Sequence, residues 1–187
     1  MIPIAPPPVE LPANVIAIVS NVPQRIGTIT KAEFQRALVQ AAAARARPVP
    51  HPVANGYGKL KIVVVGELLD AAWIRGQAME MGIGIRRRQV RRELARLRRA
   101  AFANGAEYRR FLKEAHYTRR DVSERVEIQI ISTKILERIE AGLTSESAKR
   151  KAFRRFIAEY EATWPPRTVC ARDYAIVDRC AGELPVQ

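Results

Sequence analysis

The most apolar part of the chain is residues 60–81, LKIVVVGELLDAAWIRGQAMEM, which carries no charge from Ile62 to Gly66. Its apolar residues recur at i+3 and i+4 in two neighbouring rows that together exceed half of a helix circumference. This pattern favours a single helix that other helices cover from two sides. The β-branched run 62–65 leaves a second interpretation open, in which a buried strand leads into a helix.

The chain before this stretch predicts an arm, a small β element and a first helix. Residues 1–13 hold five of the twelve prolines, which favours a linker or arm. Residues 15–19 are a short β-run, and residues 25–29 could pair back as a second strand. Thr30, followed three residues later by Glu33, has the spacing of a capping box at the start of a helix.

Four more helices follow, each with apolar residues at helical spacing. Thr118 and Ser145 are expected N-caps for the last two of them, and Pro165 ends the final helix. The pattern therefore predicts a mainly α fold of about six helices with a short N-terminal β element. The expected organisation is a Pro-rich arm at 1–13, one helical domain at 14–164 (an N-terminal part, 14–142, and a returning helix, 145–164), and an irregular Cys-containing tail at 165–187.

The chain has 187 residues and a net charge of +13, from 32 Lys and Arg against 19 Asp and Glu. Such a charge favours anionic partners, among them nucleic acid, an anionic envelope surface or acidic polypeptide. Residues 86–99 concentrate it, with eight arginines and one acid, Glu93. On a helix these arginines form a basic face, which is an ordinary solvated surface or a nucleic-acid interface. Its members are Arg86, Arg87, Arg88, Arg91, Arg92, Arg96, Arg98 and Arg99.

The two cysteines, Cys170 and Cys180, both lie near the C-terminus. They are either two free thiols or a disulfide that closes a short loop, and a disulfide would indicate an oxidising compartment. The opening residues lack the basic and apolar regions of a signal peptide.

No enzyme signature, cofactor motif or metal-ligand spacing is present. His51 and His116 have no Cys, Asp or Glu partner at ligand spacing, and the glycine pairs at 56/58 and 82/84 are turns rather than phosphate loops. We therefore expect no catalytic residues, no metal and no cofactor.

Large aromatic and methionine side chains gather in the segment that follows residue 72. Most of them are expected to pack in the core, but together they could line an apolar groove that accepts a peptide. The candidate peptide-binding residues are Trp73, Met79, Met81, Phe102, Tyr108 and Phe111.

The order of motifs resembles the N-terminal chaperone domain of SurA-type and PrsA-type extracytoplasmic foldases. The resemblance lies in VIAIVSNVPQRIGTITKAEFQRAL, then LLDAAWIRGQAMEMGIGI, VRRELARLRRAAF and AEYRRFLKEAHYTRRDVSERVEIQIISTKI, and it covers residues 15–139. The segment AFRRFIAEYEATWPPRTVCARDYAIVDRC is similar to the last helix and Cys-containing tail of actinobacterial members.

This resemblance implies an ATP-independent chaperone of the cell envelope that binds unfolded or nascent secreted polypeptides, with Cys170 and Cys180 oxidised. The chain departs from the family in two places. Only a dozen residues join Ile139 to Ala152, where members carry a parvulin-type prolyl isomerase domain, so isomerase activity is not expected. Arginines at 86–88 replace an acidic helix start, so the family's client preference does not carry over. The alternative function is nucleic-acid binding through the arginine face.

Overall fold

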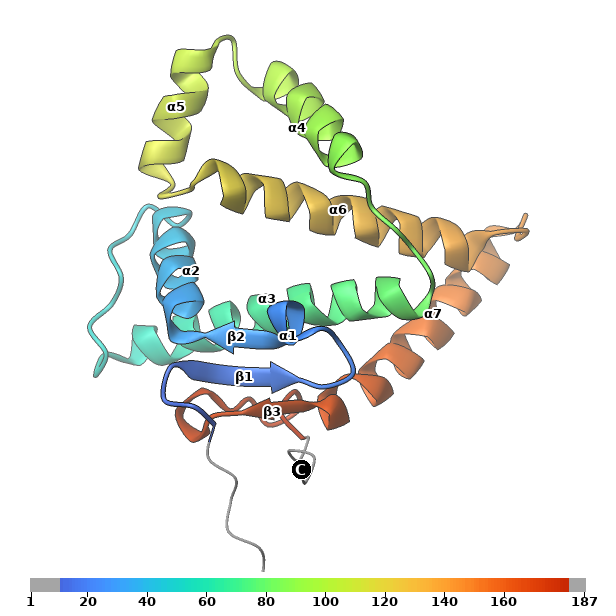
Figure 1. Cartoon of the computed structure of the whole chain (residues 1–187), viewed down its shortest axis with the longest axis horizontal. Coiled ribbons are helices and arrows are strands. Elements are labelled where there is room, and N and C mark those ends of the chain that lie inside the picture. Colours follow the sequence, from blue (N-terminus) through green and yellow to red (C-terminus); the bar gives the residue numbers. More distant parts are fainter. Residues whose placement is uncertain (1–10, 182–187) are drawn as a thin grey trace, which may run out of the picture.

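The computed structural model describes residues 11–181, and this part of the chain is mainly α with a small antiparallel sheet (Figure 1). The expected arm lies largely outside the described residues. The helices are α1 (Gln24–Gly27), α2 (Lys31–Ala43), α3 (Asn55–Glu80), α4 (Arg87–Ala101), α5 (Gly105–Glu114), α6 (Arg119–Glu140) and α7 (Glu146–Thr163). The strands are β1 (Val15–Val19), β2 (Thr28–Thr30) and β3 (Thr168–Cys170), and two 3-10 turns are η1 (Pro165–Arg167) and η2 (Arg172–Tyr174).

The sheet joins the two ends of the described chain. Its strand order is β2-β1-β3 and both pairings are antiparallel, so β1 is central. Val19 lies opposite Thr168, and Ala17 lies opposite Cys170. The expectation of an irregular tail is therefore wrong at residues 168–170, because this short segment completes the sheet edge that β1 would otherwise leave unpaired.

The second strand is shorter and later than the expected 25–29. Residues Gln24–Gly27 form the short helix α1, whose first turn bonds back to the carbonyl of Pro23. Gly27 lies so close to the carbonyl oxygen of Val19 that an added Cβ would be 2.3 Å from it. The chain thus turns tightly against β1 before β2 begins, which delays the pairing until Thr28.

The apolar stretch is a helix, and the strand interpretation of residues 62–65 is wrong. Helix α3 also begins earlier than expected, at Asn55, and it includes Gly56 and Gly58. Each glycine costs a helix about 1 kcal/mol relative to Ala. Tyr57 and Leu60 pack against the main core, and this burial offsets the cost of extending the helix.

The main core lies between the sheet, α2, α3 and the end of α7. Its fully buried large side chains come from all four, including Ile16 in β1, Phe34 in α2 and Leu69 in α3. Trp164, just after α7, is wholly buried beside Gly76 of α3, where any larger side chain would collide with its indole ring. The last helix therefore returns to the N-terminal elements, as the sequence predicted.

A second layer stands beyond α3 (Figure 1). Helix α6 packs on α3, α4 packs on α6, and the C-terminal end of α6 meets α7. A small cluster centred on Ala78, Ile131 and Ile135 joins α3 to α6. We call α4, α5 and α6 the outer layer, and the elements around the main core the sheet-side body. Within residues 11–181, no helix is long and apolar enough to cross a membrane.

Local sequence signals place the starts of α2, α6 and α7. Thr30 and Glu33 form the expected capping box of α2, and Thr118 forms one with Asp121 at α6. The Ser145 hydroxyl accepts from the amide of Ala148 at the start of α7. Each of these caps satisfies amide groups that a helix leaves without a partner in its first turn.

Candidate functional site

The six candidate peptide-binding residues occupy three separate places. Trp73 is in the main core, Met79 and Met81 lie at the C-terminal end of α3, and the remaining three meet where α4 joins α5. Only this last group forms a cluster of aromatic side chains.

Trp73 is a structural residue of the sheet-side body. It is buried, its indole Nε1 donates a 2.8 Å hydrogen bond to the Thr168 hydroxyl, and its ring meets Tyr160 edge-on at 6.0 Å. The guanidinium of Arg179 covers the ring, with its carbon 5.3 Å from the ring centroid. A side chain enclosed in this way has no surface for a client, so Trp73 is left out of the candidate site.

The two methionines differ in exposure. Met79 is 49% exposed, whereas Met81 is half-buried against the small cluster between α3 and α6. Met79 thus offers a flexible apolar side chain at the surface, and Met81 helps to anchor the segment that leads to α4.

Four aromatic side chains, Phe102, Tyr108, Phe111 and Tyr117, form what we call the aromatic corner of the outer layer. Phe102 lies 5.3 Å from Tyr108 and 5.2 Å from Phe111 between ring centroids, and Phe111 lies 5.9 Å from Tyr117. Tyr108 is buried, while Phe111 is 37% exposed. The corner is therefore a small apolar cluster with one open side.

Tyr117 is not among the residues that the sequence predicted for a binding site. Its position in the sequence could have indicated it, because Tyr117 directly precedes the Thr118 N-cap. An apolar residue at that position commonly packs against the first turns of the helix that follows. In the structure it extends the corner from α5 to the start of α6.

Arginines border the aromatic corner. The guanidinium carbon of Arg98 lies 5.5 Å from the ring centroid of Tyr108, and that of Arg125 lies 4.8 Å from the centroid of Tyr117. Cations over aromatic faces are attracted by the ring quadrupole. The corner thus combines apolar area with positive charge at its rim.

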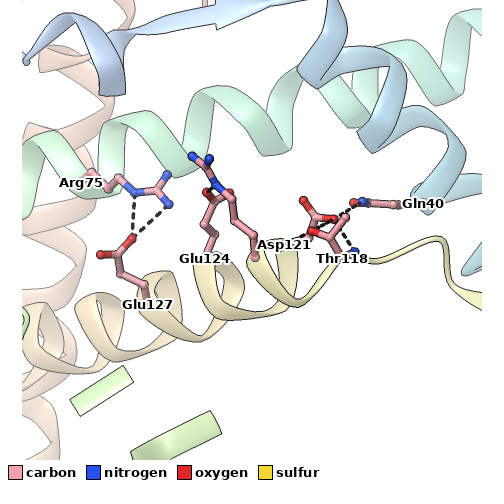
Figure 2. Close-up of polar contacts among 7 residues, drawn as sticks. Gln40, Arg75, Thr118, Asp121, Glu124 and Glu127 are labelled. Atoms are coloured by element: carbon pink, nitrogen blue, oxygen red, sulfur yellow. Dashed lines mark hydrogen bonds and ion pairs between the residues drawn. The ribbon is translucent and has the colours of Figure 1, made fainter. Parts of the chain in front are cut away.

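Polar contacts hold the outer layer to the sheet-side body, as Figure 2 shows. The amide of Gln40 in α2 donates to the carboxylate of Asp121 at 3.2 Å, and the same carboxylate oxygen accepts from the Thr118 backbone and hydroxyl. Farther along, Arg75 of α3 pairs with Glu127 of α6 at 3.3 Å. This half of the α6 interface is polar, whereas the half toward Ile135 is apolar.

The arginine face of α4 is exposed along its whole length, so it is available to a partner. Arg96 pairs with Glu93, and this hydrogen bond lowers the pKa of the Glu93 carboxyl. The other seven arginines of the face form no ion pair with a residue in the described part of the chain.

A disulfide closes a loop within the tail, and an ion pair fixes this loop to α3. Cys170 and Cys180 are joined, which decides between the two alternatives that the sequence left open. The closed loop carries Arg179, which pairs with Asp70 of α3. Burial of Tyr160, with a smaller effect from the Asp70 carboxylate, raises the pKa of its hydroxyl well above the ordinary value.

No group of His, Cys, Asp and Glu side chains suited to a metal occurs among residues 11–181. His51 and His116 are both exposed. The disulfide is compatible with an extracytoplasmic location.

Comparison with known proteins adds no relative: no protein-family model, curated protein or solved structure matches this chain.

Proposed function

We propose that this chain is an ATP-independent chaperone that binds unfolded or partly folded polypeptides in the cell envelope, without prolyl isomerase activity. The observation that carries the proposal is the aromatic corner, a cluster of four rings that is open at Phe111. Folded clients hide their apolar side chains and unfolded ones expose them, so an open aromatic cluster discriminates between the two states.

The chemistry of the corner suits clients of varied sequence. Aromatic rings supply a large contact area with few rotatable bonds, and they accept aliphatic, aromatic and cationic side chains alike. The order of sequence motifs, which resembles the chaperone domain of extracytoplasmic foldases, supports the same assignment. The Cys170–Cys180 disulfide supports a place outside the cytoplasm.

The connection between the last two helices supports the exclusion of isomerase activity. Helix α6 ends at Glu140 and α7 begins at Glu146, so no catalytic domain is inserted at this point. A proline-isomerisation assay on a short peptide is expected to give no turnover above background.

The test of the proposal is suppression of client aggregation by Phe111→Ala. Light scattering is followed while chemically unfolded citrate synthase is diluted into buffer with increasing amounts of the chain. Loss of Phe111 is expected to raise the amount needed for half-maximal suppression by about threefold or more, because exposed aromatic anchors dominate such contacts.

Phe153→Ala is the matched control, because Phe153 is also a partly exposed phenylalanine but lies on α7, away from the corner. It is expected to leave suppression unchanged. Equal loss of aggregation suppression in the two variants would mean that the aromatic corner does not bind the client. Steeply salt-dependent DNA binding with no suppression of aggregation would favour the nucleic-acid alternative.

A further inference from the structure

The connection between α3 and α4 lies beside two adjoining hollows. The larger, of about 650 Å³, opens between α4 and α6. The smaller, of about 360 Å³, continues along α6 toward its C-terminal end. They share Gly84 and Lys134, so together they form one groove.

The larger hollow is lined by cations without a balancing acid. Its charged lining residues are Arg86, Arg88, Arg92 and Lys134, and the other two are Gly84 and Gln89. None of the four cations forms an ion pair with a residue in the described range 11–181. Four positive charges around one hollow repel one another, and an anion placed between them relieves that repulsion.

The wall between the two hollows is open backbone. At Gly82 and at Gly84 an added Cβ would meet nothing within 4 Å. Lys134 of α6 reaches across to this backbone, where its ammonium donates to the Gly84 carbonyl at 3.3 Å. The backbone at Gly82 and Gly84 is therefore open to contact by an extended chain.

The smaller hollow has a different character. Ile83 and Ala141 give it apolar surface, and besides the shared Lys134 it has one charge of each sign, from Glu137 and Arg138. The groove thus presents strong positive charge at one end and mixed, partly apolar surface at the other. A polypeptide segment that carries carboxylates next to apolar side chains complements both ends.

We propose that this groove binds acidic segments of client polypeptides, with carboxylates held by Arg86, Arg88, Arg92 and Lys134. The proposal rests on the chaperone function above and names the client class that it prefers. A carboxylate pairs well with arginine, whose planar guanidinium donates two parallel hydrogen bonds. None of the lining residues of this groove is aromatic, so it offers no aromatic platform on which nucleic-acid bases could stack.

Paired peptides and paired variants test the proposal. Fluorescence anisotropy measures the binding of a short labelled peptide of alternating glutamate and leucine, and of its twin with glutamine at each glutamate. The variant Arg88→Gln/Arg92→Gln removes two lining charges. The control Arg87→Gln/Arg91→Gln removes two exposed charges from the same helix, with the same spacing, that are not in the lining.

The glutamate peptide is expected to bind the unmodified chain about tenfold more tightly than the glutamine peptide. The lining variant is expected to lose about tenfold in affinity for the glutamate peptide, and the control less than about threefold. Equal losses in the two variants would overturn the proposal in favour of a general charge effect. Equal binding of the two peptides would overturn it as well.

Two competitors separate polypeptide from other anions. The competitors are a short DNA duplex and phosphatidylglycerol vesicles. If either one displaces the glutamate peptide and binds the unsubstituted protein more tightly than the peptide does, the choice of polypeptide as the ligand is overturned. Failure of both competitors to displace the peptide at matched anion concentration supports it.

Failure of this proposal is distinguishable from failure of the proposed function. Suppression of aggregation that depends on Phe111, without preference for the glutamate peptide, would reject the acidic-segment site and leave the chaperone function standing. Selective peptide binding through Arg88 and Arg92, without suppression of aggregation, would support the site and reject the chaperone function.

Discussion

The sheet-side body and the outer layer differ in how deeply they bury their apolar side chains. In the body, the sheet, α2, α3 and Trp164 bury large side chains completely. In the outer layer, α4 and α5 each bury a single residue, Val90 and Tyr108, and α6 buries Val126, Ile131 and Ile135 where it packs on its neighbours. The difference places most of the apolar burial, and with it most of the stability, in the body. The outer layer is left with surface that can be used for contacts.

Sequence composition explains this division. Helix α3 carries two apolar rows and is covered by the sheet, α2, α6 and α7. Helix α4 carries one narrow apolar stripe among its arginines and packs chiefly on α6. Removal of side chains should therefore have very different consequences in the two regions.

The largest expected effect is that of Trp164→Ala in the body. Truncation of this fully buried indole empties the space beside Gly76 and removes the hydrogen bond from its Nε1 to the Gln77 amide oxygen. We expect a loss of about 3–5 kcal/mol in the free energy of unfolding. Denaturant unfolding followed by circular dichroism measures it.

Leu97→Ala in α4 is the comparison variant, because Leu97 is only half-buried in the outer layer. A loss of about 1 kcal/mol is expected there. Similar losses of unfolding free energy at the two positions would contradict the conclusion that the body carries most of the stability.

The next effect is that of the disulfide, tested by Cys170→Ser/Cys180→Ser. The bridge closes a loop across ten positions of sequence and ties it to β3 at the sheet edge, and Arg179 in the loop pairs with Asp70 of α3. Its removal is expected to cost about 2–4 kcal/mol, and reductant should lower the melting temperature of the unmodified chain but not of the double variant. Hydrogen exchange should rise in β3 and the loop that follows, while α4 and α5 keep their exchange rates. A general rise across the outer layer would contradict a local role for the bridge.

A smaller effect is expected from Thr118→Ala, which removes the cap of α6 at the point where α6 meets α2. The variant loses the hydroxyl that accepts from the Asp121 amide, at a cost of about 1 kcal/mol. Thr133→Ala is the control, because this exposed threonine in α6 bonds only to the Gln129 carbonyl in the same helix. Chemical denaturation of the two variants side by side measures the difference. Equal stabilities would mean that the cap does not anchor the outer layer.

The smallest effect is confined to alkaline pH and concerns Tyr160. Burial raises the pKa of its hydroxyl in the folded chain above the value of about 10 expected in the unfolded chain. The folded state therefore holds the phenolic proton more tightly. Its contribution to stability is complete below about pH 10 and is lost as the pH rises from there toward the folded pKa.

Tyr160→Phe cannot ionise, so its stability should fall less steeply than that of the unmodified chain above about pH 10. At pH 7 the two should agree within about 0.5 kcal/mol. Denaturant unfolding at a series of pH values checks both statements. Parallel curves above pH 10 would mean that ionisation of Tyr160 does not contribute to alkaline unfolding.

The residues of the aromatic corner and those of the groove between α4 and α6 were predictable from the sequence to different degrees. The sequence predicts Phe102, Tyr108 and Phe111 as candidates because large aromatic and methionine side chains are frequent in the segment that follows residue 72. Trp73 was grouped with them, yet its partner Thr168 lies 95 positions away, and no local pattern indicates that contact. The groove depends on Lys134 of α6 reaching residue 84, another contact between distant segments.

The sequence by itself determined the mainly α class, the existence of helices α2 to α7, and the caps of α2, α6 and α7. These features follow from interactions within a few residues, such as the Thr30–Glu33 box or the apolar rows of α3. Only the tertiary structure decided that residues 168–170 form a strand, that Cys170 and Cys180 pair, and that Trp73 lies in the core. Each of these depends on contacts between distant segments, because β1 supplies the partner for β3 and the returning end of α7 brings the tail to α3.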